Sequence, residues 1–139
     1  MTISKLINNL MVADVRASAD FYRNCLGFEL VMAVPDGTHD AVQSFSDGVD
    51  YCFAVVKHGD VEIMLQSAES AKEEFPDISF SGDGSGTILY MQVKDVEGLF
   101  SLVKNNQNII KGLHEAFYGM KEFYMKDPDG YILGFAEKG

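Results

Sequence analysis

The sequence contains the same four-residue pattern twice, and this repeat restricts the possible fold more than any other feature. Residues 12–15 read Val-Ala-Asp-Val and residues 93–96 read Val-Lys-Asp-Val, 81 positions later. Each copy follows a run typical of a β-strand and precedes apolar residues at helical spacing. Asp14 and Asp95 suit the first position of a helix, because a carboxylate accepts hydrogen bonds from free helical N–H groups. The sequence therefore predicts two strand–helix units of similar design.

Further strands are predicted around both helices. The eight expected strands cover about 5–12, 28–34, 49–57, 60–66, 86–93, 108–114, 118–126 and 131–137. Each half therefore has the order βαβββ. The predicted fold class is α+β, with two βαβββ modules forming a curved mixed sheet and the helices on its outer face. A chain of 139 residues suits a single domain, with modules at about 3–66 and 86–137 and a polar linker at about 67–85.

Alternation along the strands predicts which side chains point away from the helices, because successive residues of a strand face opposite sides of a sheet. One face of each strand is purely apolar and is expected to pack on the helices. The other face mixes polar and large apolar side chains, among them Asn9, Met11, Glu62, Met64, Gln66, Tyr90 and Gln92. A curved sheet with such an inner face is the outline of a binding cleft.

Charge and composition argue against several classes of partner. Eleven Lys and Arg against 21 Asp and Glu give a net charge of −10, the wrong sign for nucleic acid or an anionic membrane. No apolar run is long enough to span a bilayer, and residues 1–20 do not resemble a signal peptide. Cys25 and Cys52 are too few for a disulfide framework and are predicted to be small buried apolar residues. We therefore expect a cytoplasmic protein with no nucleic-acid and no membrane partner.

Several short motifs follow one another in order along nearly the whole chain. They are Val12-Ala13-Asp14, Phe21-Tyr22 with Leu26-Gly27-Phe28, the stretch 59–66, Val93-Lys94-Asp95-Val96, and Tyr118-Gly119-Met120-Lys121-Glu122-Phe123 leading to Asp127-Pro128-Asp129-Gly130-Tyr131. As an ordered set they resemble the vicinal oxygen chelate superfamily, which includes glyoxalases, extradiol dioxygenases, fosfomycin-resistance enzymes and bleomycin-resistance proteins. The last stretch is most similar to the bleomycin-resistance-like branch. The resemblance also implies a homodimer.

The resemblance raises the question of a metal site. Enzymes of this superfamily hold a divalent metal with His, Gln or Glu side chains, one from the first and last strand of each module, and the metal polarises two adjacent substrate oxygens. The corresponding positions here are Ile7, Met64, Ile88 and Gly134. None of them binds Zn²⁺, Ni²⁺, Mn²⁺ or Fe²⁺. The metal site is therefore expected to be lost, no cofactor is expected, and Met64 and Ile88 are expected to be packed.

The remaining polar side chains do not form a known catalytic motif. His39, His58 and His114 show no metal-binding spacing and are interpreted as surface residues in or beside turns. Asp127 and Asp129 are interpreted as parts of a turn, because Pro and Gly accompany them. Glu115 and Glu122 are acid or base candidates, but a solvated hairpin face explains them equally well. No catalytic residue is assigned.

These observations predict a metal-free protein that binds and sequesters an unidentified small molecule. The alternatives are a divalent-metal-dependent lyase, isomerase or dioxygenase with non-standard ligands, and a purely structural or partner-binding domain. The predicted ligand-binding residues are Asn9, Glu62, Met64, Gln66, Tyr90, Gln92, Tyr118 and Phe123. Glu62 is expected to select a positively charged group, and Tyr118 and Phe123 are expected to stand at the rim. A cationic or aromatic ligand is expected, since an acidic surface raises the local concentration of cations.

Overall fold

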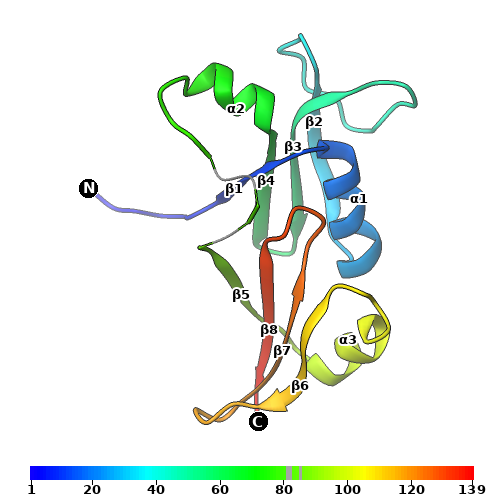
Figure 1. Cartoon of the computed structure of the whole chain (residues 1–139), viewed down its shortest axis with the longest axis vertical. Helices are drawn as coiled ribbons and strands as arrows, with labels where there is room; N and C mark the ends of the chain where they lie inside the picture. The colour runs from blue at the N-terminus through cyan, green and yellow to red at the C-terminus, as the bar shows by residue number, and fades with distance from the viewer. Residues whose placement is uncertain (81–82, 85) are drawn as a thin grey trace. The chain divides into compact units, whose positions relative to one another are not determined.

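The computed structural model describes residues 1–80, 83–84 and 86–139, and the chain forms two compact units, 1–82 and 83–139 (Figure 1). The elements of the first unit are β1 (Asn8–Val12), α1 (Val15–Leu26), β2 (Glu29–Pro35), β3 (Tyr51–His58), β4 (Val61–Ser67) and α2 (Ala68–Glu74). Those of the second are β5 (Ile88–Gln92), α3 (Val96–Val103), β6 (Ile109–Glu115), β7 (Met120–Lys126) and β8 (Ile132–Lys138). The α+β class and the two βαβββ modules are therefore confirmed, with α2 following the first module.

Each unit contains one four-stranded mixed sheet. The strand orders are β1-β4-β3-β2 and β5-β8-β7-β6, so the two modules share one topology. The first strand of each module runs parallel to the last strand, and the other neighbours are antiparallel. In the parallel pairs Asn9 lies opposite Met64, and Tyr90 lies opposite Gly134.

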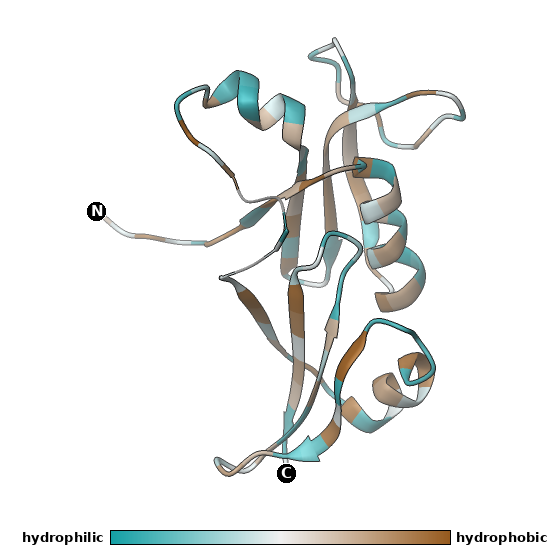
Figure 2. Ribbon diagram, viewed as in Figure 1, coloured by the Kyte–Doolittle hydropathy of each residue, from teal (hydrophilic) through white to brown (hydrophobic). Residues whose placement is uncertain are grey.

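The predicted alternation of the strands is confirmed in both cores. In the first unit Tyr22 of α1 is buried, as are Ile63 and Leu65 of β4. In the second, Val96 of α3 is buried, as are Phe123 of β7 and Phe135 of β8. Figure 2 shows hydrophobic positions along the strands of both sheets and a largely hydrophilic α2. The apolar faces of both sheets are therefore covered by α1 and α3, and the mixed faces are left for other roles.

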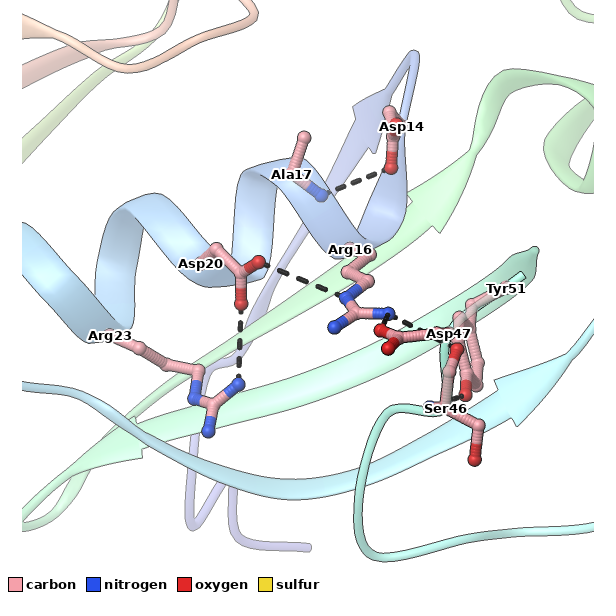
Figure 3. Close-up of polar contacts among 8 residues, drawn as sticks. All are labelled: Asp14, Arg16, Ala17, Asp20, Arg23, Ser46, Asp47 and Tyr51. Atoms are coloured by element: carbon pink, nitrogen blue, oxygen red, sulfur yellow. Dashed lines mark hydrogen bonds and ion pairs between the residues drawn. The ribbon is translucent and has the colours of Figure 1, made fainter. Parts of the chain in front are cut away.

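The N-terminus of α1 is capped as the repeat predicts. The Asp14 carboxylate accepts a hydrogen bond from the Ala17 N–H at 3.0 Å (Figure 3). The helix ends at Gly27, whose φ of 72° lies in the left-handed region that glycine tolerates. In the second module the Asp95 carboxylate accepts from the Gly98 N–H at 3.1 Å, so both copies of the repeat use one capping device.

The loop between β2 and β3 is held against α1. Arg16 donates to the Ser46 carbonyl oxygen at 3.1 Å, and the Ser46 N–H donates to the Tyr51 hydroxyl at 2.7 Å (Figure 3). The guanidinium groups of Arg16 and Arg23 lie over the Phe45 ring, 5.5 and 5.8 Å from its centroid. Cation–π contacts of this kind add to the hydrogen bonds. The loop therefore has a fixed position against α1.

Two expectations from composition have a structural counterpart. No helix in the described part of the chain combines the length and the hydropathy that crossing a bilayer requires. Cys25 and Cys52 are free thiols, and both are half-buried where the sequence predicts full burial. The Cys52 thiol donates to the Val34 carbonyl oxygen at 3.5 Å.

Candidate functional site

The second unit contains a buried carboxylate surrounded by phenols. Glu122 of β7 is only 3% exposed. Its carboxylate accepts hydrogen bonds from the hydroxyls of Tyr90 at 2.5 Å, Tyr118 at 2.7 and 2.8 Å, and Tyr124 at 3.1 Å. The Nε2 atom of His114 lies 3.3 Å from the same carboxylate. Side chains from β5, β6, β7 and the β6–β7 turn therefore share one anion, and we call these five residues the Glu122 cluster.

Strand alternation explains why this cluster forms. Phe123 and Met125 face α3, so Glu122 and Tyr124 lie on the opposite face of β7. Tyr90 lies opposite Gly134 in the ladder between β5 and β8. A side chain at Gly134 would collide with the rings, because an added Cβ would lie 2.7 Å from Tyr124 Cε1 and 2.9 Å from Tyr90 Cδ1. The glycine therefore makes room for the two tyrosines.

The hydrogen bonds keep Glu122 ionised in spite of its burial. Burial by itself raises the pKa of this carboxyl, but the bonds from Tyr90, Tyr118, Tyr124 and His114 together lower it below its ordinary value of 4.5. The bond to Glu122 is the main cause that raises the pKa of Tyr118 to about 12. Burial, followed by hydrogen bonds, raises the pKa of Tyr124 to about 12, and burial raises that of Tyr90. At neutral pH the cluster is an anion held by protonated phenols.

This cluster predicts a loss of stability at both ends of the pH range. The contribution of Tyr118 and Tyr124 is complete below pH 10.0 and disappears as the pH rises toward about 12, since folding raises their pKa. The contribution of Glu122 is complete above pH 4.5 and disappears as the pH falls, since folding lowers its pKa. Melting temperature against pH should fall on both sides, and Glu122→Gln should flatten both slopes. Unchanged slopes in the variant would assign them to other groups.

A pocket of about 480 Å³ lies beside the cluster. Its lining includes His114, Phe117, Tyr118, Glu122 and Tyr124, together with Lys111 and Glu115. The His114 ring stacks on Tyr124 with 6.3 Å between centroids, and Phe117 meets Tyr118 edge-on at 5.0 Å. Two carboxylates face one ammonium group in this lining, and the remaining walls are mainly aromatic. Such a volume suits a small organic molecule, and aromatic faces beside an anion suit a cation.

A second pocket, of about 530 Å³, lies in the first unit. Its floor contains Gln66, which is 5% exposed and accepts from the Asn9 side-chain amide at 2.8 Å. The Gln66 amide in turn donates to Ser70 Oγ and to Glu74 Oε1, both at 3.1 Å. Phe53 of β3, Glu73 of α2 and His39 of the β2–β3 loop complete the lining. This pocket is lined by amides and carboxylates rather than by phenols.

The structure brings some predicted ligand-binding residues together in pairs. Asn9 and Gln66 meet in the pocket of the first unit, and Tyr90 and Tyr118 meet at Glu122. The other four predicted residues, Glu62, Met64, Gln92 and Phe123, line neither of these two pockets. Glu62 forms an ion pair with Lys5 at 2.9 Å, so its charge already has a partner within the chain. Met64 is half-buried on β4, and Gln92 is exposed at the end of β5.

Several sequence-based interpretations are wrong at the level of single residues. Phe123 is fully buried, 5.1 Å from the Phe100 ring and 5.2 Å from the Phe135 ring, and does not stand at a rim. Ile88 is 56% exposed, so it is not packed as expected. Glu122, for which the sequence leaves an acid or base role and a solvated hairpin face open, is buried. His114, interpreted as a surface residue, is half-buried beside it. The alternation of Glu122 and Tyr124 with Phe123 and Met125 was the signal that pointed to Glu122.

The four positions that the resemblance assigns to a metal do not fit one. Ile7 and Ile88 offer hydrocarbon, and Met64 offers a thioether, which is a poor ligand for these divalent ions. At Gly134 the tyrosine rings occupy the space that a ligand side chain needs. Among the described residues no group of three or more His, Cys, Asp or Glu is placed to hold a metal. These four positions therefore do not form a site for a divalent metal.

Substitution of Gly134 tests this packing. Gly134→Ala is expected to lower the free energy of unfolding by about 1–3 kcal/mol, because the added methyl overpacks the rings of Tyr90 and Tyr124. Gly112→Ala, in β6, is the matched control, since no atom lies within 4 Å of its added Cβ. Urea denaturation of both variants measures the difference. Equal stability of the two would mean that the rings do not cover Gly134.

Comparisons with known proteins place this geometry in context. Residues 5–135 match the family model described as the glyoxalase/bleomycin resistance protein/dioxygenase superfamily. No curated protein matches the chain. One similar solved structure is a protein of unknown function from Agrobacterium tumefaciens, with 20% identity, a TM-score of 0.72, and coverage of 100% of this chain and 98% of that one. Another is TioX from Micromonospora, with 17% identity, a TM-score of 0.73, and coverage of 98% of this chain and 99% of that one. A glyoxalase-related enzyme from Fulvimarina pelagi is also similar, with 18% identity, a TM-score of 0.70, and coverage of 96% of this chain and 86% of that one. At these identities the structures show a common fold.

Proposed function

The chain belongs to the glyoxalase/bleomycin resistance protein/dioxygenase superfamily, and from this premise we propose that it is a metal-independent protein that sequesters a small organic cation. The observation that supports this most directly is the ionised Glu122 carboxylate beside an aromatic pocket of about 480 Å³. A partly buried anion is stabilised by an opposite charge, so the pocket favours a cationic guest.

The hydrogen bonds of the Glu122 cluster narrow the class of cation. The carboxylate already accepts bonds from three tyrosine hydroxyls and faces His114, so little acceptor capacity remains for N–H groups of a ligand. Its negative charge remains, and so do the ring faces in the lining. A quaternary ammonium group needs no acceptor and binds through charge and aromatic faces alone. We therefore assign a quaternary or fully alkylated ammonium ligand to this pocket.

Calorimetric titration with benzyltrimethylammonium tests the proposal. Binding is expected in protein pretreated with a chelator and unchanged after addition of Zn²⁺ or Mn²⁺, because the four metal positions offer no suitable ligand set. Benzyl alcohol, a neutral aromatic control, is expected to bind at least about tenfold more weakly. Binding that requires the metal would favour the enzyme alternative, and equal binding of both probes would overturn cation selection.

A pair of aromatic variants assigns the binding to this pocket. Phe117 lines the pocket and is fully exposed, so Phe117→Ala is expected to weaken benzyltrimethylammonium binding severalfold without loss of folding. Phe75→Ala removes another exposed phenyl ring, from the first unit, and is expected to leave binding unchanged. Similar losses in both variants would mean that the probe binds non-specifically to exposed rings.

Homodimer formation, which the family resemblance implies, is a further proposal. Exposed large apolar side chains include Ile88, Leu102, Ile110 and Phe117 in the second unit, and contact with a second copy would remove such surface from water. Light scattering at micromolar concentration should then report about twice the chain mass of 15.4 kDa. A mass of one chain over the whole concentration range would contradict the dimer.

A further inference from the structure

We propose that the pocket of the first unit is a second binding site, which takes a planar amidinium or guanidinium group carried on an aromatic ring. The pocket shares no lining residue with the Glu122 pocket. Binding at this site can therefore be tested separately from binding at the Glu122 pocket.

The amide pair of Asn9 and Gln66 supplies the first recognition element. Gln66 is buried, with an exposed fraction of 5%. Hydrogen bonds to Asn9, Ser70 and Glu74 fix its side chain. Asn9 donates its amide N–H to Gln66, which fixes the orientation of the Asn9 side chain. Across the described residues no donor reaches Asn9 Oδ1, so this carbonyl is left as an acceptor at the pocket.

The carboxylates of α2 supply the second element. Glu73 lines the pocket and, over the described ranges, takes part in no ion pair. Glu74 uses Oε1 to accept from Gln66. Neither Lys nor Arg is among the residues that line this pocket, and His39 is its one basic side chain. The lining therefore favours a cation that donates hydrogen bonds, in contrast to the saturated carboxylate of the Glu122 cluster.

The pocket offers acceptors of two kinds, the Asn9 amide oxygen and the Glu73 carboxylate. An amidinium or guanidinium group presents several N–H donors in one plane, which matches a carboxylate and an amide oxygen better than a single ammonium does. Phe53 adds a half-buried ring against which an aromatic group can pack. A volume of about 530 Å³ accommodates a one- or two-ring ligand.

The remaining wall is held in place by the rest of the unit. His39 belongs to the β2–β3 loop, which is attached to α1 through Phe45 and Ser46. The Thr38 hydroxyl accepts from the Asp40 N–H at 3.2 Å and donates to the Pro35 carbonyl oxygen at 2.9 Å, which fixes the backbone around His39. The backbone that carries His39 is therefore held in place, which reduces the ordering that binding requires.

Calorimetric titration with benzamidine tests this inference on the full chain. Wild-type protein is expected to bind the probe, and Glu73→Gln is expected to weaken binding at least about tenfold, because one charge-assisted hydrogen bond is lost. Glu69→Gln is the matched control: it removes the same charge from the same helix, outside the pocket lining, and should change affinity less than about twofold.

Three results would overturn the inference. They are no benzamidine binding at about 10 mM, equal weakening by Glu69→Gln and Glu73→Gln, and displacement of benzamidine by saturating benzyltrimethylammonium. The last result would assign both probes to the Glu122 pocket and leave the proposed function intact. Independent binding of the two probes, with Glu73→Gln affecting benzamidine alone, supports two sites. Side-chain amide signals of Asn9 and Gln66 in NMR spectra should then shift with benzamidine only.

Discussion

Phe123→Ala is expected to lower the free energy of unfolding by about 3–5 kcal/mol, the range for phenylalanine removed from a protein core. The ring is fully buried and lies between the rings of Phe100 and Phe135. Its removal leaves a cavity under α3 that these two rings fill only in part. Urea denaturation monitored by circular dichroism measures the loss.

Ile88→Ala provides the contrast within the same sheet. Ile88 is 56% exposed, so its truncation is expected to cost less than about 1 kcal/mol, as for other surface substitutions. Truncation of a rim residue should cost as little free energy of unfolding as Ile88→Ala, and truncation of a core residue as much as Phe123→Ala. Equal, small effects of both substitutions would restore the rim position that the sequence predicted for Phe123.

Glu122→Gln is expected to reduce both stability and cation binding. The amide is neutral and has one acceptor oxygen, so the variant loses charge-assisted hydrogen bonds from Tyr90, Tyr118 and Tyr124. Hydrogen bonds to charged groups contribute about 1.5–3 kcal/mol each at most, and we expect a total loss of about 2–4 kcal/mol because Tyr118 regains water. Affinity for benzyltrimethylammonium is expected to fall at least about tenfold.

The control for this variant is Glu115→Gln. Glu115 also lines the pocket, but it is exposed, so its charge is screened by water. Glu115→Gln is expected to change the free energy of unfolding by less than about 0.5 kcal/mol and the affinity for benzyltrimethylammonium by less than about threefold. If the two variants weaken binding equally, the pocket attracts cations through its overall charge and the Glu122 cluster has no special role.

The fold was largely predictable because its signals are local. Asp14 and Asp95 follow a strand and cap a helix through bonds that span only three residues. Alternation then assigns the apolar face of each strand to the helices, as the buried Ile63 and Leu65 show. Sequence reasoning also interpreted Asp127 correctly as a turn residue, since its carboxylate accepts the backbone N–H groups of residues 129 and 131.

The candidate site was harder to predict because it depends on contacts between strands. Alternation gives the face of β7 on which Glu122 lies, but the burial of its carboxylate depends on Tyr90, 32 positions earlier, and on His114 across the β6–β7 ladder. A glutamate in a hairpin is usually solvated. Phe123 was misplaced for the same reason, since its position in a hairpin motif was given more weight than its alternation with Glu122 and Tyr124.

The rings over Gly134 restrict how this chain can evolve. A histidine or glutamate introduced at that position, as a first step toward metal binding, would collide with the rings of Tyr124 and Tyr90. Either tyrosine would have to be replaced beforehand, and each replacement removes a hydrogen bond from Glu122. A first step on this route therefore removes a hydrogen bond from Glu122 before it adds a metal ligand. A metal ligand at position 134 and the Glu122 cluster are therefore alternatives that one chain cannot hold together.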